Sequence, residues 1–138
     1  DERGLPQPSW DLWEERRGVH TFTVATTIGA LHAAAAFASD FGEQDRAALY
    51  REGAAKMTLA MRRFMWNDEE KRFARNVVPM PDGTYRMDMA ADSANYALFA
   101  FAGLPITDPM VVGEMEAMRE RVTVRTPVGG YARYHHDY

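Results

Sequence analysis

Small and apolar residues recur at spacings of three and four through residues 21–41 and again through residues 43–66. The first stripe comprises Phe22, Ala25, Ile28, Leu31, Ala35 and Ala38. The second comprises Ala47, Tyr50, Ala54, Met57, Met61, Phe64 and Met65. This period is typical of one face of a helix. Gly42 lies between the two stripes, where a left-handed residue ends a helix. The pattern predicts two long helices in an antiparallel hairpin.

The next segment lacks this period. Two short extended stretches flank a Pro-Asp-Gly sequence at residues 81–83, which favours a small hairpin near residues 72–87. Asp92 and Ser93 offer helix caps for a third helix at 93–102. Thr107, Asp108 and Pro109 open a fourth, which runs to about residue 122. We therefore expect an all-α fold with one small extended excursion.

Composition narrows the classes of partner. The 138 residues are 46% hydrophobic and 26% charged, which is typical of an ordered domain. The net charge of −4 gives no sign of the positively charged surface that binds nucleic acid, so we expect no nucleic-acid partner. The longest apolar run, residues 31–38, falls short of the roughly 18–20 residues that span a bilayer, so we expect no membrane partner. The absence of cysteine excludes disulfides and Cys-based zinc sites and suits a reducing compartment, so we expect a cytoplasmic protein.

The densest chemistry lies at residues 9–17, where Asp11, Glu14 and Glu15 accompany two tryptophans. One interpretation is structural: Ser9 caps a short helix whose first turn accommodates acidic side chains. The other is functional. Neighbouring carboxylates and partial burial raise the pKa of a carboxyl group, which keeps a general acid protonated, while aromatic faces pack against sugar rings. Acid and aromatic residues together indicate carbohydrate chemistry.

The other candidate functional residues are less informative. His135, His136 and Asp137 are metal-ligand types, but adjacent histidines should point apart and no spaced third ligand accompanies them, so we expect no metal. Asp92 is interpreted as a helix cap and Asp88 as a loop residue. Nothing in the sequence demands a cofactor.

Residues 4–23, with Asp-Leu-Trp-Glu-Glu at 11–15, resemble the catalytic-acid segment of glycoside hydrolase family 15, the glucoamylase-like enzymes. Gly103-Leu104-Pro105 and residues 129–138 are similar to later landmarks of bacterial members, so the resemblance covers essentially the whole chain.

The resemblance implies a six-hairpin (α/α) toroid and an enzyme of carbohydrate and polysaccharide catabolism. Such enzymes release terminal glucose with inversion from α-linked glucosides: starch-type oligosaccharides, isomalto-sugars or trehalose. By position, Glu14 resembles the general acid, Glu15 and Arg133 resemble substrate-binding groups, and Trp13 resembles a pocket wall. Asp11 and Asp137 match further motif positions and are carried as substrate-binding candidates.

The sequence lacks two features that the family's enzymes need. An inverting glycosidase needs a second carboxylate roughly 6.5–9.5 Å from the acid, and in this family the base lies beyond the Arg-Tyr landmark at 133–134. The toroid also needs more helices than the pattern supplies. Residues 1–138 are therefore expected to be a single fragment of a catalytic domain, inactive alone, whose apolar face is covered by the remaining helices. The alternative is a non-catalytic helical module that binds sugar or a protein partner.

Overall fold

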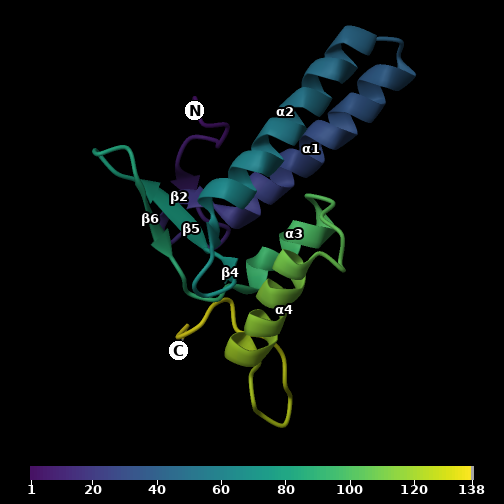
Figure 1. Ribbon diagram of the computed structural model, residues 1–138. Coiled ribbons are helices and arrows are strands. Elements are labelled where there is room, and N and C mark those ends of the chain that lie inside the picture. The colour runs from purple at the N-terminus through teal and green to yellow at the C-terminus, as the bar shows by residue number, and fades with distance from the viewer. Residues whose placement is uncertain (138) are drawn as a thin grey trace.

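A long helical hairpin dominates the computed structural model, which describes residues 1–137 (Figure 1). Helix α1 spans Thr21–Asp40 and α2 spans Gln44–Phe64, which confirms the two predicted helices. Gly42 joins them with a φ of 78°, in the left-handed region that glycine adopts without steric cost. The two helices pack along their whole length, and Gly53 of α2 lies against the side chain of Leu31.

Helix α1 is long and apolar enough, by length and composition alone, to cross a membrane, with a mean hydropathy of 1.4. The count of uninterrupted apolar residues missed this, because threonine, glycine and histidine interrupt the apolar run while the many alanines keep its mean hydropathy high. The core helix of a soluble protein meets the same two criteria, and a third of this window is buried here (33%).

A four-stranded antiparallel sheet lies at the open end of the hairpin, in the order β1-β2-β5-β6. Its strands are β1 (Ser9–Trp10), β2 (Arg17–His20), β5 (Asn76–Pro79) and β6 (Tyr85–Asp88). The central register pairs Val19 with Val77. A separate two-stranded sheet joins β3 (Trp66–Asn67) to β4 (Arg72–Phe73).

The all-α expectation is wrong, because the structure is 46% helix and 16% strand. The expected hairpin near residues 72–87 is present as β5 and β6, with Gly83 at a φ of 83° in its turn, but it belongs to a larger sheet. The short helix proposed after Ser9 is instead a β1–β2 hairpin whose loop carries the acidic cluster. The strands on either side of that loop pair with each other, and β2 also pairs with β5, a distant partner that a local pattern cannot show.

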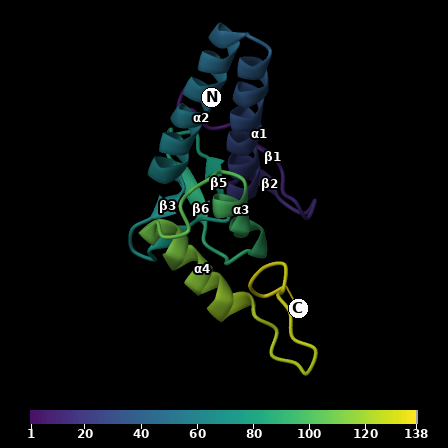
Figure 2. The same cartoon turned by 90° about the vertical axis from the view of Figure 1, so that its right-hand side faces the viewer.

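Two shorter helical segments follow the sheets (Figure 2). Asp92 accepts a hydrogen bond from the Ala94 N–H and caps a 3₁₀ turn, η1 (Ser93–Tyr96), which continues into α3 (Ala97–Ala100). The predicted helix at 93–102 is thus shorter and partly 3₁₀. Asp108 caps α4 (Pro109–Val122) in the same way, with proline in the first turn, as expected.

The hydrophobic core fills the space between the hairpin, the sheet and α3–α4. Within it, the fully buried Glu114 of α4 accepts hydrogen bonds from the Phe73 N–H (3.0 Å) and from the Asn95 amide (2.8 Å). This carboxyl group therefore ties α4 to β4 and to η1. Burial raises the pKa of Glu114 above its usual 4.5.

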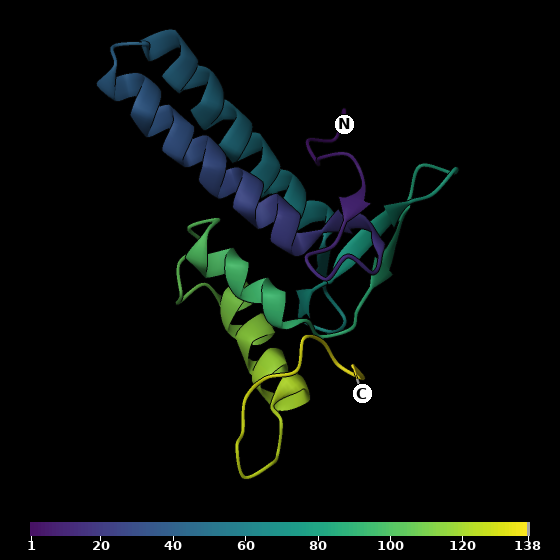
Figure 3. The same cartoon turned by 180° about the vertical axis from the view of Figure 1, so that it is seen from behind.

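The C-terminal segment returns from α4 toward the connection between β6 and η1 (Figure 3). Tyr134 forms an antiparallel bridge with Asp92, the Ser93 N–H donates to the Arg133 carbonyl (2.8 Å), and the His135 N–H donates to the Ala91 carbonyl (2.7 Å). Residues 131–137 are thereby fixed beside the start of η1.

Candidate functional site

The loop between β1 and β2 carries the acidic cluster and is closed by Asp11. The Asp11 side chain is buried, and its Oδ1 accepts hydrogen bonds from the backbone N–H groups of Glu15 (2.8 Å) and Arg16 (3.3 Å). The Asp11 N–H donates to the Arg16 carbonyl at 2.9 Å. Asp11 therefore faces inward and holds the loop, whereas sequence reasoning placed it among groups that contact substrate.

Glu14 occupies an uncommon backbone conformation in this loop. Its φ of 59° is left-handed, a region that few residues other than glycine and asparagine adopt, and such strain clusters at functional sites. The Glu14 side chain is exposed. Among residues 1–137, no side chain or backbone group donates a hydrogen bond to its carboxyl group.

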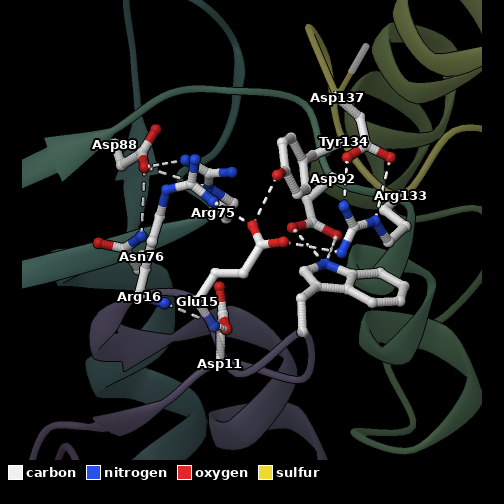
Figure 4. A network of polar contacts seen from close by, with 11 residues as sticks. Asp11, Glu15, Arg16, Arg75, Asn76, Asp88, Asp92, Arg133, Tyr134 and Asp137 are labelled. Atoms are coloured by element: carbon white, nitrogen blue, oxygen red, sulfur yellow. Dashed lines mark hydrogen bonds and ion pairs between the residues drawn. The ribbon is translucent and has the colours of Figure 1, made fainter.

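The neighbouring Glu15 lies at the centre of a polar network (Figure 4). Its carboxylate accepts hydrogen bonds from the Tyr134 hydroxyl (2.6 Å), Arg133 Nη1 (2.8 Å) and Arg16 Nη1 (3.1 Å). These donors lower the pKa of Glu15 below its usual 4.5, the Tyr134 hydroxyl having the largest effect. Glu15 is thus held as an ionised hydrogen-bond acceptor near neutral pH.

Arg133 is oriented by Asp137. Its Nε and Nη2 atoms donate to the two carboxylate oxygens of Asp137, at 3.1 Å and 2.6 Å, the fork geometry that fixes a guanidinium group in a plane. Hydrogen bonding to Arg133 lowers the pKa of Asp137, and hydrogen bonding to Asp137 raises the pKa of Arg133. Nη1 is left to bind Glu15, and 44% of the Arg133 side chain remains exposed.

Trp13 is fastened to the buried Asp92. The indole Nε1 donates to both carboxylate oxygens of Asp92, at 3.2 Å and 3.1 Å. Burial raises the pKa of Asp92. Asp92 therefore has two roles, as the predicted cap of η1 and as an anchor for Trp13, and only the first could be inferred from the sequence.

Sequence reasoning missed Arg75, and it interpreted Asp88 only as a loop residue. Arg75 follows β4 and binds Asp88 of β6 through Nη2 and, at 3.1 Å, through Nε, while the Asn76 amide adds a third donor at 3.3 Å. Burial raises the pKa of Asp88, but the Arg75 contacts outweigh it and leave that pKa below 3.8. Arg75 lies in the connection between β4 and β5, and no local signal in the sequence pairs it with Asp88.

The structure thus brings Trp13, Glu15, Arg133 and Asp137 together, with Glu14 next to them on the loop. Beneath the loop is a cavity of about 10 Å³, the space of one water molecule, lined in part by Asp11, Trp13, His20, Arg75 and Asp92. A sugar does not fit there. A sugar bound at this site would lie on the outer side of the loop, where Glu14 and Arg133 are exposed.

Within the described part of the chain, no three His, Cys, Asp or Glu side chains are arranged to hold a metal ion. The rings of His135 and His136 do not point apart as expected but stack, with centroids 3.7 Å apart.

Comparison with known proteins gives three findings. Residues 2–136 match the model of glycosyl hydrolases family 15. An uncharacterized glycosyl hydrolase from Methanocaldococcus jannaschii is 24% identical over 131 residues, which are 94% of this chain and 20% of that protein. A probable glucoamylase from Schizosaccharomyces pombe is 40% identical over 58 residues, 42% of this chain and 13% of that protein.

Among solved structures, a bacterial glucoamylase complexed with acarbose superimposes with a TM-score of 0.78 at 18% identity, over 96% of this chain and 23% of that one. This match shows a shared fold. The chain spans a fifth or less of the length of the two relatives.

Proposed function

The chain belongs to glycosyl hydrolases family 15, and from this premise we propose that the complete protein releases terminal glucose from α-linked glucosides with inversion, with Glu14 as the general acid. The proposed substrates are starch-type oligosaccharides, isomalto-sugars and trehalose. The solved glucoamylase with acarbose supports a carbohydrate ligand.

The contrast between the two adjacent glutamates carries the assignment of roles. A general acid must hold a proton that it can give to the departing glycosidic oxygen. Glu15 is unsuited to this role, because three donors stabilise its ionised form and lower its pKa. The Glu14 carboxyl group is exposed and occupies a strained position on the same loop, so the acid role falls to Glu14.

Glu15 and Arg133 then form the sugar-binding pair. A carboxylate accepts hydrogen bonds from sugar hydroxyl groups, and a guanidinium group donates to them. Both groups are partly exposed, and both are already oriented by their own hydrogen bonds, which reduces the entropy lost when a sugar binds. Trp13 is fixed by Asp92 and supplies an indole ring beside Arg133. Asp137 acts by orienting Arg133, and Asp11 acts by holding the loop backbone.

We also propose that residues 1–138 are one fragment of the catalytic domain and that the remainder supplies the base, roughly 6.5–9.5 Å from Glu14. The short coverage of both relatives supports this. So do large apolar side chains exposed near the turn between α1 and α2: Phe37, Phe41 and Leu49 are 64–71% exposed. Further helices of the same domain would cover them.

The test uses the complete gene product with Glu14→Gln, and Glu52→Gln on the exposed face of α2 as the matched control. We expect the first variant to hydrolyse maltose, isomaltose and trehalose about 10²- to 10⁴-fold more slowly and the control to match wild type. NMR of the first product should show β-glucose. On α-glucosyl fluoride, whose leaving group needs no proton, Glu14→Gln should lose far less activity. Near-normal turnover of maltose by Glu14→Gln would refute the role of Glu14. Sugar binding without hydrolysis by the wild-type protein would refute the proposed activity.

A further inference from the structure

Tyr134 holds a central position in the polar network that its place in the sequence does not reveal. Its side chain is almost fully buried, at 9% exposure. Its backbone is bridged to Asp92, and the residues on either side of it are bound to residues 91 and 93. The backbone of Tyr134 is therefore held by a segment about 40 residues earlier in the chain, the same segment that anchors Trp13.

The hydroxyl group of Tyr134 makes the shortest hydrogen bond to Glu15, at 2.6 Å to Oε2. An O–H donor to a carboxylate at this distance is a strong, charge-assisted hydrogen bond. The bond raises the pKa of Tyr134, so that the phenol stays protonated and remains the donor. It has the largest effect in lowering the pKa of Glu15.

The ring of Tyr134 contacts three guanidinium groups. The central carbons of Arg16, Arg75 and Arg133 lie 4.8 Å, 5.0 Å and 5.3 Å from the ring centroid. These arginines come from the β1–β2 loop, the end of β4 and the C-terminal segment, and Figure 4 shows them around the tyrosine. Each also binds its own carboxylate: Glu15, Asp88 and Asp137, respectively. The aromatic ring thus packs against three like charges without adding a charge of its own.

We propose that Tyr134 is a positioning residue for Glu15. Its hydroxyl group fixes the carboxylate that binds sugar, and its ring keeps the surrounding guanidinium groups in place. This inference rests on the proposed function for its kinetic consequences, although the positioning itself is a property of the described residues.

The variant Tyr134→Phe removes the hydroxyl group and keeps the ring. In the complete protein we expect the KM for maltose to rise about three- to tenfold with kcat changed less than threefold, because the hydrogen bond serves binding. The acid limb of the kcat/KM profile should move to higher pH, since Glu15 loses the donor that favours its ionised form. Tyr134→Leu removes the ring as well, and its KM should rise further.

Tyr85→Phe is the matched control. The Tyr85 hydroxyl also donates to a carboxylate, Asp1 Oδ2 at 2.9 Å, and its ring also contacts a guanidinium group, that of Arg3 at 4.7 Å, but the pair lies away from Glu15. The control should keep the wild-type KM and pH profile. An unchanged KM and acid limb in Tyr134→Phe would overturn the proposal.

A second readout separates this proposal from the proposed function. In protein labelled with ¹³C at glutamate carboxyl groups, the signal that disappears in Glu15→Gln identifies Glu15, and its titration gives the pKa directly. We expect that pKa to rise in Tyr134→Phe and to stay constant in Tyr85→Phe, even if the protein hydrolyses none of the three sugars. An equal Glu15 pKa in wild type and Tyr134→Phe would refute the positioning role on its own.

Discussion

Gly29 in α1 and Gly53 in α2 offer a matched test of how closely the hairpin approaches α3. A Cβ added at Gly53 would lie 3.6 Å from the Leu31 side chain, an ordinary contact. A Cβ added at Gly29 would lie 2.7 Å from the backbone carbonyl oxygen of Phe101, which is closer than atoms tolerate. That backbone cannot easily move aside, because the Phe101 N–H is bound to the Ala97 carbonyl at 2.9 Å.

The two substitutions should change stability in opposite directions. Alanine in place of glycine within a helix stabilises by about 0.5–1 kcal/mol, so Gly53→Ala should raise the free energy of unfolding by that amount. At Gly29 the same gain is opposed by overpacking, which costs about 1–3 kcal/mol. The net result for Gly29→Ala is a loss on the order of 1 kcal/mol, and the two variants should differ by about 2 kcal/mol.

Urea unfolding of the complete protein, followed by circular dichroism, measures this difference, and equal m-values show that both variants unfold from comparable native states. If Gly29→Ala stabilises the protein as much as Gly53→Ala does, then α1 does not contact the Phe101 carbonyl. The placement of α3, and with it of η1 and Asp92, would then be wrong.

Two further predictions concern buried charges. Asp88→Asn leaves the guanidinium group of Arg75 buried without an ionised partner and should lower the free energy of unfolding at pH 7 by about 2–3 kcal/mol. Because Arg75 holds the pKa of Asp88 below 3.8, this contribution is present above pH 3.8 and should disappear as the pH falls through the lowered pKa. Urea unfolding of wild type and Asp88→Asn at a series of pH values from 7 downward checks both statements, because the difference between the two proteins should shrink only below pH 3.8. Glu114 behaves oppositely: burial raises its pKa, so its contribution is present below pH 4.5 and is lost as the pH rises through the folded-state pKa. Between pH 4.5 and pH 7 the wild type should therefore lose more stability than Glu114→Gln, and parallel pH profiles would contradict this reasoning.

The helices of this chain could be predicted because their signals are local. The apolar stripes, Gly42 and the caps at Asp92 and Asp108 each act within a few residues, and the structure places helices or turns at all of them. The sheet could not be predicted in the same way. Val19 of β2 pairs with Val77 of β5 across more than fifty residues, and a local pattern cannot reveal such a partner.

The residues of the candidate site also fall into two groups: those that a sequence motif indicates and those that only long-range packing brings in. Trp13, Glu15, Arg133 and Asp137 were identified through a family motif, and the structure joins them in one network. Arg75 belongs to no motif, and only the packing of the sheet against the loop brings it to Tyr134. Asp11 was carried as a substrate-binding candidate, but a tight loop needs an acceptor for its inner N–H groups, and the Asp11 carboxylate supplies it from within.

The conformation of Glu14 depends on contacts that its own carboxyl group does not make. Its loop is held from beneath by Asp11 and from the side by Glu15, which binds Arg133 and Tyr134 of the C-terminal segment. That segment is held by backbone pairing with residues 91–93. Three stretches far apart in the sequence therefore fix one another, and the strained conformation of Glu14 persists because the contacts around it over-determine it. Losing one positioning hydrogen bond should therefore cost less activity than losing the Glu14 carboxyl group itself, because the remaining contacts still hold the loop.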